Sequence, residues 1–260
     1  MEGVASGDIA MSRYHLHEVV DFLEASVSVG RQRLVRIEYG LLPLFVNDLH
    51  GGPEKLRSLM KTIMSDPAVF VDLLCKTYKG ECEDMEDESE EVSESTALML
   101  WNLFHSGLRT QPGGYPYDTS KGVNPARFQG FIDKVLELAA SRCRRKIAEH
   151  VLGQIIGRGP TGSDGLVPQE AARAVLDRPD LGEMRNGLYY GLINKRGVTT
   201  RGPYEGGRQE RELVDQYRKN ADALRTQYPR LAATLDQVAN SYEREAAEHD
   251  ADAARTREQF

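Results

Sequence analysis

Residues 208–249 read RQERELVDQYRKNADALRTQYPRLAATLDQVANSYEREAAEH, and this stretch decides the fold class. Apolar and tyrosine side chains recur every three or four residues in both halves, which is the spacing of one face of an α-helix. They are Leu213, Tyr217, Ala221, Leu224 and Tyr228 before Pro229, and Leu231, Leu235, Val238, Tyr242 and Ala246 after it. The stretch predicts two amphipathic helices that pair as a hairpin and need further helices to cover their apolar faces.

The rest of the chain shows the same helical spacing. Residues that favour strands do not occur in alternating runs bounded by turns, whereas Ala, Leu, Glu, Arg and Gln fill long segments. We therefore predict an all-α fold of about ten helices, either a multi-helix bundle or an irregular α-solenoid that ends in the long hairpin.

Prolines indicate where individual helices begin and break. The apolar segment 31–49 contains Pro43, which lacks a backbone donor, so its helix should kink or divide there. Asp66 before Pro67 and Asn124 before Pro125 each combine a capping side chain with a proline suited to the first helical position.

Two single residues are expected in the core. Trp101 is the only tryptophan and is predicted to act as a core anchor. Cys75 lies within an apolar stripe and is predicted to be buried.

Charge and turn residues divide the chain into parts. The run from Glu81 to Glu91 holds eight acids and no base, and its mutual repulsion predicts a solvated loop. The predicted parts are a flexible N-terminal segment 1–13, an N-terminal helical part 14–80, an acidic loop 81–92, a C-terminal helical part 93–250 that contains hairpin 208–249, and a frayed tail 251–260.

Composition restricts the classes of function. The net charge of −7 points away from a general nucleic-acid binder, and no apolar run approaches the roughly 20 residues that cross a bilayer. The N-terminus lacks the order of a signal peptide. Cys75, Cys82 and Cys143 include no CxxC pair, and bonding any two leaves one over, so we expect a reducing, cytoplasmic setting.

Residues 194–208, NKRGVTTRGPYEGGR, form the most distinctive loop. Glycines and cations that lead into a helix start are the ingredients of an anion pocket, because backbone donors and guanidinium groups both bind phosphate or carboxylate. The candidate ligands are Lys195, Arg196, Arg201 and Arg208. The alternative, which we favour, is a structured connector whose bases contact carboxylates of neighbouring helices.

A second basic patch comprises Arg142, Arg144, Arg145 and Lys146. Four bases at a helix start or joint could meet a phosphate or, more simply, pair with the acidic loop of the same chain. We favour the intramolecular or solvated state.

Motifs for catalysis are sparse. GRGPTG at 157–162 matches GxGxxG, but a segment of helical period precedes it where a dinucleotide loop needs a strand, so we interpret it as a connection between helices. HExxH, a nucleophile elbow, a Walker loop and a paired metal-ligand cluster do not occur. We predict no catalytic residues, no metal and no cofactor; an enzyme, the less favoured reading, would have to use His105, Glu149 or His150.

Residues 194–201 (NKRGVTTR), 203–211 (PYEGGRQER) and 241–246 (SYEREA) are similar to the helical C-terminal region of large, poorly characterised bacterial multidomain proteins, and residues 37–71 resemble the same region. The resemblance implies a helical module of a larger bacterial assembly, such as an anti-phage defence system, and it supplies no catalytic residues that could be transferred to this chain. The leading hypothesis is thus a non-enzymatic module that binds a protein partner or an adjacent domain. The alternative is that the chain binds the phosphates of a nucleic acid or nucleotide through the Gly/Arg loop 194–208.

Overall fold

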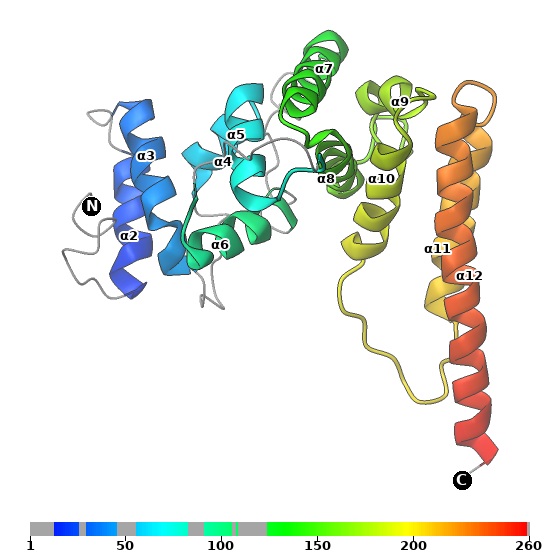
Figure 1. Ribbon diagram of the computed structural model, residues 1–260. Coiled ribbons are helices and arrows are strands. Elements are labelled where there is room, and N and C mark those ends of the chain that lie inside the picture. The colour runs from blue at the N-terminus through cyan, green and yellow to red at the C-terminus, as the bar shows by residue number, and fades with distance from the viewer. Residues whose placement is uncertain are drawn as a thin grey trace. The chain divides into compact units, whose positions relative to one another are not determined.

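The computed structural model describes residues 13–25, 30–45, 56–82, 91–105, 108 and 124–258. In these ranges all regular structure is helical, with eleven α-helices and one short 3-10 helix, which confirms the predicted all-α class (Figure 1). The chain divides into two compact units, residues 1–148 and 149–260.

The first unit contains a cluster of aromatic rings centred on Phe70. Its helices are α2 (Arg13–Ala25), α3 (Arg31–Leu41), η1 (Leu42–Phe45), α4 (Arg57–Ile63), α5 (Pro67–Thr77), α6 (Glu94–His105) and α7 (Pro125–Ser141), and α8 (Arg145–Arg158) crosses into the second unit. The Phe70 ring on α5 meets Phe104 of α6 at 5.3 Å and Phe131 of α7 at 6.0 Å, both edge to face. This geometry is favourable for aromatic rings, and it joins three helices in one core.

The predicted proline signals are confirmed. The α-helix α3 ends at Leu41, and Pro43 lies in the 3-10 turn that follows. The Asp66 carboxylate accepts a hydrogen bond from the Ala68 amide at 2.9 Å, and Asn124 Oδ1 accepts one from the Arg127 amide at 3.1 Å. These side chains satisfy amides that the first turn of a helix leaves without partners.

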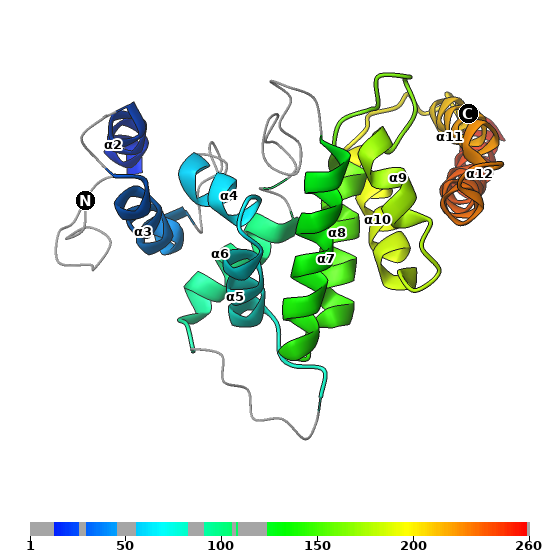
Figure 2. The same cartoon turned by 90° about the horizontal axis from the view of Figure 1, so that it is seen from above.

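The second unit ends in the predicted hairpin. It contains α9 (Glu170–Leu176), α10 (Gly182–Lys195), α11 (Arg208–Leu224) and α12 (Pro229–Glu258). Helices α11 and α12 lie side by side in both views (Figures 1 and 2), and α12 continues past His249. Tyr217 and Tyr242 stack across the hairpin at 5.9 Å, so the two apolar stripes face each other as their spacing predicts.

Helices α8 and α10 approach each other at backbone distance. A Cβ atom added to Gly187 would lie 2.0 Å from the carbonyl oxygen of His150, and one added to Gly153 would lie 2.0 Å from that of Met184. Gly191 continues the same contact along the crossing. Only glycine allows two helix backbones to come this close.

The prediction that Trp101 anchors the core is wrong. Its side chain is 44% exposed and stacks on the His105 ring at 4.1 Å. Helix α6 is apolar on several sides and can bury only one of them, and that side holds Leu100, Leu103 and Phe104. The helical spacing places Trp101 on a different face.

The cysteines depart from the expectation of free thiols in a reducing setting. Cys82 and Cys143 form a disulfide, with their Cα atoms 5.7 Å apart, whereas Cys75 is free and buried, as predicted. Neighbouring backbone supports the bridge, because the Glu81 amide donates to the Cys143 carbonyl at 2.7 Å. Sequence spacing alone did not reveal a pair that is 61 residues apart.

Some predictions lie outside the described residues. Residues 1–12 hold nearly all of the predicted flexible segment, and residues 83–90 hold most of the acidic loop. Across the described helices, none is both long enough and apolar enough to cross a membrane.

Candidate functional site

The loop 196–207, between α10 and α11, is held by one buried carboxylate. Glu210 lies in the first turn of α11, and its side chain is fully buried. Its two oxygens accept hydrogen bonds from Arg201 at 2.8 Å and 3.1 Å. Arg196 also bonds to Glu210 and donates to Glu245 Oε1 on α12 at 3.2 Å. Two of the predicted anion ligands therefore converge on a carboxylate of the chain itself.

The charge state of Glu210 follows from these contacts. Burial alone would raise the pKa of its carboxyl group, but the hydrogen bonds from Arg201 and Arg196 outweigh burial and lower the pKa to about 2. The same contact with Glu210 raises the pKa of Arg201. The network is consequently ionised at neutral pH.

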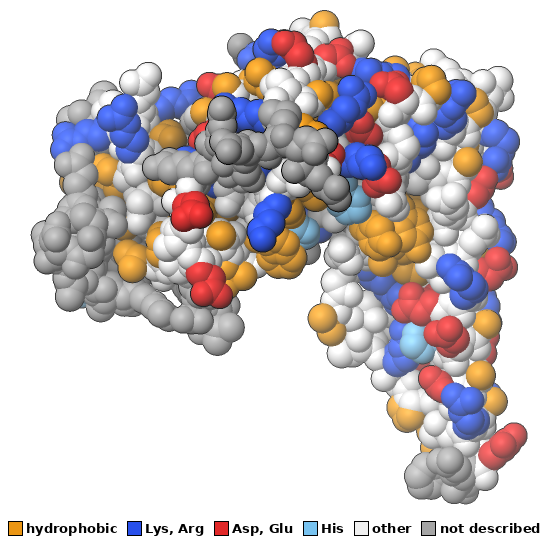
Figure 3. All heavy atoms as spheres, viewed as in Figure 1, with side chains coloured by type: hydrophobic (Ala, Val, Ile, Leu, Met, Phe, Trp, Pro, Cys, Tyr) orange, Lys and Arg blue, Asp and Glu red, His pale blue; other side chains and the backbone are white. Residues whose placement is uncertain are grey.

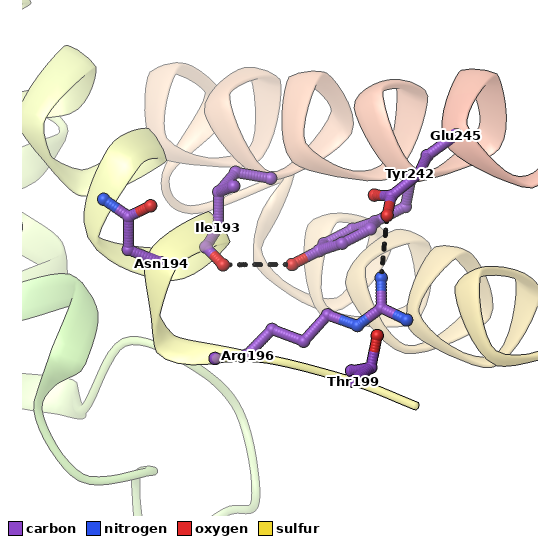
Figure 4. Close-up of a pocket in the computed structure, with 7 residues that line it drawn as sticks. Ile193, Asn194, Arg196, Thr199, Tyr242 and Glu245 are labelled. Atoms are coloured by element: carbon purple, nitrogen blue, oxygen red, sulfur yellow. Dashed lines mark hydrogen bonds and ion pairs between the residues drawn. The ribbon is translucent and has the colours of Figure 1, made fainter. Parts of the chain in front are cut away.

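A pocket of about 330 Å³ lies beside this network, where α10 ends against α12 (Figure 4). Its lining residues are Ile193, Asn194, Arg196, Gly197, Thr199, Tyr242 and Glu245. The Tyr242 hydroxyl donates to the Ile193 carbonyl at 3.5 Å, and the Arg196 guanidinium lies 5.6 Å from the centre of the Tyr242 ring. Because Arg196 and Glu245 neutralise each other in the wall, the pocket has no strong preference for either sign of ligand charge.

The other two predicted ligands lie elsewhere. Lys195 Nζ donates to the Gly159 carbonyl at 2.7 Å, and Arg208 lies 3.4 Å from the Glu205 carboxylate at the surface. The four cations therefore do not form one pocket. Their contacts correspond to the structured connector that the sequence analysis favoured, and anion binding stays a prediction.

The second basic patch is also engaged within the chain. Arg142 lies 3.6 Å from the Asp72 carboxylate, and the buried Arg144 donates to the Tyr78 carbonyl at 3.1 Å. Arg145 and Lys146 open α8, where the Glu81 carboxylate accepts from the Lys146 amide at 3.3 Å. An acid of the predicted acidic loop thus caps the helix that begins within the basic patch.

The candidate enzyme residues show no catalytic arrangement in the described part of the chain. His105 Nδ1 lies 3.0 Å from the Trp101 carbonyl, and His150 Nε2 lies 3.0 Å from Gln154 Nε2. Burial lowers the pKa of His150, despite the opposing charge of Glu183. His150 and the buried Glu149 are not among the residues that line the pocket.

Glu210, Glu245 and His249 place ligand atoms within 4.8 Å of one another, a spacing that suits a metal ion. However, Arg196 and Arg201 already occupy the Glu210 oxygens, and their positive charges oppose a cation there. The group therefore fits an ion-pair network better than a metal centre. The sequence signal for this group is weak, since only Glu245 and His249 are close in the chain, four residues apart on one helix face.

Comparison of the chain with protein-family models, with curated proteins and with solved structures finds no match. The assignment of function therefore depends on the geometry of this chain.

We expect Glu210→Gln to lower the free energy of unfolding by about 2 kcal/mol, since it removes the charge that two part-buried arginines share. Urea denaturation measures the effect. The matched control is Glu243→Gln, which breaks the exposed ion pair with Arg218 and should cost at most about 0.5 kcal/mol. Equal losses in the two variants would contradict the central role of Glu210.

The same variant gives a pH test. Glu210 has a pKa of about 2 in the folded chain, below the usual 4.5, so its stabilisation is complete above pH 4.5 and is lost as pH falls toward 2. The stability difference between wild type and Glu210→Gln should therefore shrink over this range. A difference that is constant down to pH 2 would show that the carboxylate charge is not its source.

Proposed function

We propose that this chain is a non-enzymatic helical protein-interaction module, and that the loop 196–207 forms part of its recognition surface. The supporting observation is that the cations of this loop bind carboxylates of the chain itself, chiefly Glu210, and so act as anchors of the loop. The resemblance to bacterial multidomain proteins supports a larger bacterial assembly, for example in anti-phage defence, as its setting. A cytoplasmic location belongs to the same proposal, although the Cys82–Cys143 disulfide weighs against a reducing compartment.

The anchored loop presents apolar groups to solvent. Val198 is 99% exposed, and Tyr204 is about half-exposed. The Arg257 side chain donates to the Tyr204 carbonyl at 2.9 Å, and Asp250 accepts from the Gly207 amide at 2.9 Å. A partner that binds a loop already fixed in this way loses little conformational entropy in ordering it.

A second patch of the second unit also exposes hydrophobic side chains to solvent. Tyr190 on α10 is about half-exposed, and its ring meets that of Tyr189 edge to face at 5.2 Å. Figure 3 shows hydrophobic side chains grouped on the surface over the C-terminal half of α10. Exposed tyrosines are typical of protein interfaces, because they combine apolar area with a hydrogen-bonding group.

Phosphate binding has less support. A phosphate would have to displace Glu210 or Glu245 from Arg196 and Arg201, and positive and negative side chains are interspersed along the hairpin in Figure 3. This mixture lacks the single-sign field that concentrates a polyanion.

In the test, the purified chain is immobilised on a support and exposed to a lysate of its source organism. A protein that it enriches is identified, purified and titrated against the chain. We expect Val198→Asp to weaken that complex about tenfold, because it places a charge in an apolar contact. The matched control is Ala233→Asp, which puts the same charge on an exposed position of α12 and should leave the affinity unchanged.

Two outcomes would overturn the proposal. One is the absence of any protein whose binding is reproduced with purified components. The other is binding of nucleic acid or nucleotide, with an affinity that falls steeply with salt and depends on Arg196 and Arg201, which would establish the phosphate-binding alternative.

A further inference from the structure

The Cys82–Cys143 disulfide lies at the surface of the first unit. Cys82 is exposed and Cys143 is partly exposed, whereas the free Cys75 is buried. A thiol in solution opens a disulfide by attacking one of its two sulfurs, so the reaction depends on access to that sulfur. The bridge is therefore open to exchange with small thiols, and Cys82 is its more accessible side.

The two bonded cysteines have sequence neighbours of opposite charge. Cys82 lies within the acidic run 81–91, whereas Cys143 lies within the second basic patch, between two arginines. Cations beside a cysteine stabilise its thiolate, and anions destabilise it. The thiolate of Cys143 is therefore the more stable of the two.

Contacts at the joint between α7 and α8 keep the cations beside Cys143. The buried Arg144 donates to the Arg142 carbonyl at 2.7 Å, so its guanidinium folds back past the cysteine that separates them. The carboxylates of Asp72, 3.6 Å from Arg142, and of Glu81, which caps α8, offset part of the positive charge. Among the described residues at this joint, the cations outnumber the carboxylates.

Charge and exposure favour the same direction of exchange. The sulfur whose thiolate is more stable leaves faster, and the attacking thiolate bonds to the other sulfur. Cys143 is thus the leaving group, and Cys82, the more exposed residue, is the one attacked. The opposite assignment would develop negative charge within the acidic run.

The backbone at Cys143 adopts a conformation that favours glycine, with a φ of +52°. The Cys143 amide donates to the Ala140 carbonyl at 3.2 Å, and the Arg144 amide donates to the Ala139 carbonyl at 2.8 Å. This pattern usually ends a helix at a glycine. Opening the bridge removes a constraint on this conformation, so the joint should loosen.

We propose that Cys82 is a site of reversible S-thiolation, at which small thiols such as glutathione open and close the disulfide. A thiolate attacks the Cys82 sulfur and forms a mixed disulfide, while the Cys82–Cys143 bond breaks and its electron pair goes to Cys143. A second thiolate attacks the sulfur of the attached small thiol and releases the Cys82 thiolate. In the net reaction two thiols are oxidised to their disulfide, and the bridge takes up two electrons and two protons.

The site reconciles a disulfide with the proposed cytoplasmic setting, where persistent bridges are rare and transient ones serve redox sensing. In the open state, the contacts of Glu81 with the Lys146 and Ile147 amides keep the same segments together. The inference concerns the first unit and does not depend on the recognition surface at 196–207.

The wild-type chain tests the direction of exchange. The folded, oxidised chain is exposed briefly to reduced glutathione at millimolar concentration, quenched with N-ethylmaleimide and mapped by mass spectrometry. We expect glutathione on Cys82 and maleimide on Cys143. Glutathione mainly on Cys143, or a bridge that stays intact in the folded chain, would overturn the proposal.

Alkylation rates test the stability of the Cys143 thiolate in variants that keep one cysteine of the pair. At neutral pH, Cys143 in Cys82→Ser should react with iodoacetamide about tenfold faster than Cys82 in Cys143→Ser, because more of it is thiolate. Circular dichroism verifies that both variants remain folded, and peptide mapping separates the signal of Cys75. Equal rates for the two cysteines would contradict the assignment of Cys143 as the leaving group.

Removal of single charges tests the role of the basic patch. Arg142→Gln in the Cys82→Ser background should slow alkylation of Cys143 about threefold. The matched control is Lys134→Gln, which removes an exposed cation about two turns away on α7 and should leave the rate unchanged. Equal effects of the two substitutions would show that the patch does not act on the thiolate.

Amide hydrogen exchange measures the response of the joint. On reduction, the Cys143 and Arg144 amides should exchange faster, while the Tyr242 amide in α12 should not change. Exchange at the joint that is the same in both redox states would contradict its loosening.

Discussion

Loss of the Cys82–Cys143 disulfide is expected to lower the free energy of unfolding by about 4 kcal/mol. The bridge closes a loop of 61 residues in sequence, so breaking it restores many conformations to the unfolded chain. In the folded chain, Glu81 beside the bridge accepts hydrogen bonds from the Lys146 and Ile147 amides and links the same two segments. Removal of the disulfide should therefore weaken the first unit without abolishing its fold.

Urea denaturation of the oxidised chain, compared with Cys82→Ser and Cys143→Ser, measures this difference. The reductant dithiothreitol should destabilise the wild type to the level of the variants and leave Cys82→Ser unchanged. After denaturation, the oxidised chain should present one reactive thiol, that of Cys75, and the reduced chain three. Three thiols after incubation with oxidised glutathione would show that the bridge does not form.

Local sequence signals predicted the elements of the fold. The break at Pro43 and the helix starts at Asp66 and Asn124 depend on chemistry within a few residues, and each is present in the structure. The hairpin was predictable because the stripes that contain Tyr217 and Tyr242 each occupy one helix face.

Features that depend on packing between distant segments were not predicted. Trp101 was placed in the core by residue type, but the face of α6 that is buried depends on its neighbours in space. The disulfide could be predicted only by knowing that Glu81 contacts the joint between α7 and α8. In each case the sequence shows the residue, and only the tertiary fold shows its partner.

The candidate site was predicted in part. Arg196 and Arg201 were singled out from the composition of their loop, but the direction of their side chains was not evident. Their partner Glu210 is nearby in sequence, whereas Glu245 becomes a neighbour only through the register of the hairpin. Residue type therefore indicated where the cations are concentrated, and the geometry identified the carboxylates that they contact, in keeping with the structured connector that we favoured over an anion pocket.

Substitution Gly187→Ala is expected to cost about 3 kcal/mol of unfolding free energy, because its Cβ would lie 2.0 Å from the His150 carbonyl oxygen. The obstacle is backbone, so a change of side-chain rotamer cannot relieve it. Helices α8 and α10 would have to move apart, and the loss of packing along the crossing would exceed the gain in helix propensity from alanine. Gly153→Ala should have a comparable effect from the opposite helix, since it meets the Met184 carbonyl at the same distance.

The matched control is Gly130→Ala in the middle of α7, where an added Cβ meets nothing within 4 Å. That variant should be more stable than wild type by about 0.5–1 kcal/mol, since alanine favours a helix over glycine. Opposite signs for the same substitution in two helices would attribute the loss to the close crossing of α8 and α10. If Gly187→Ala were also neutral or stabilising, the two helices could not lie at backbone contact, and this packing of the second unit would be incorrect.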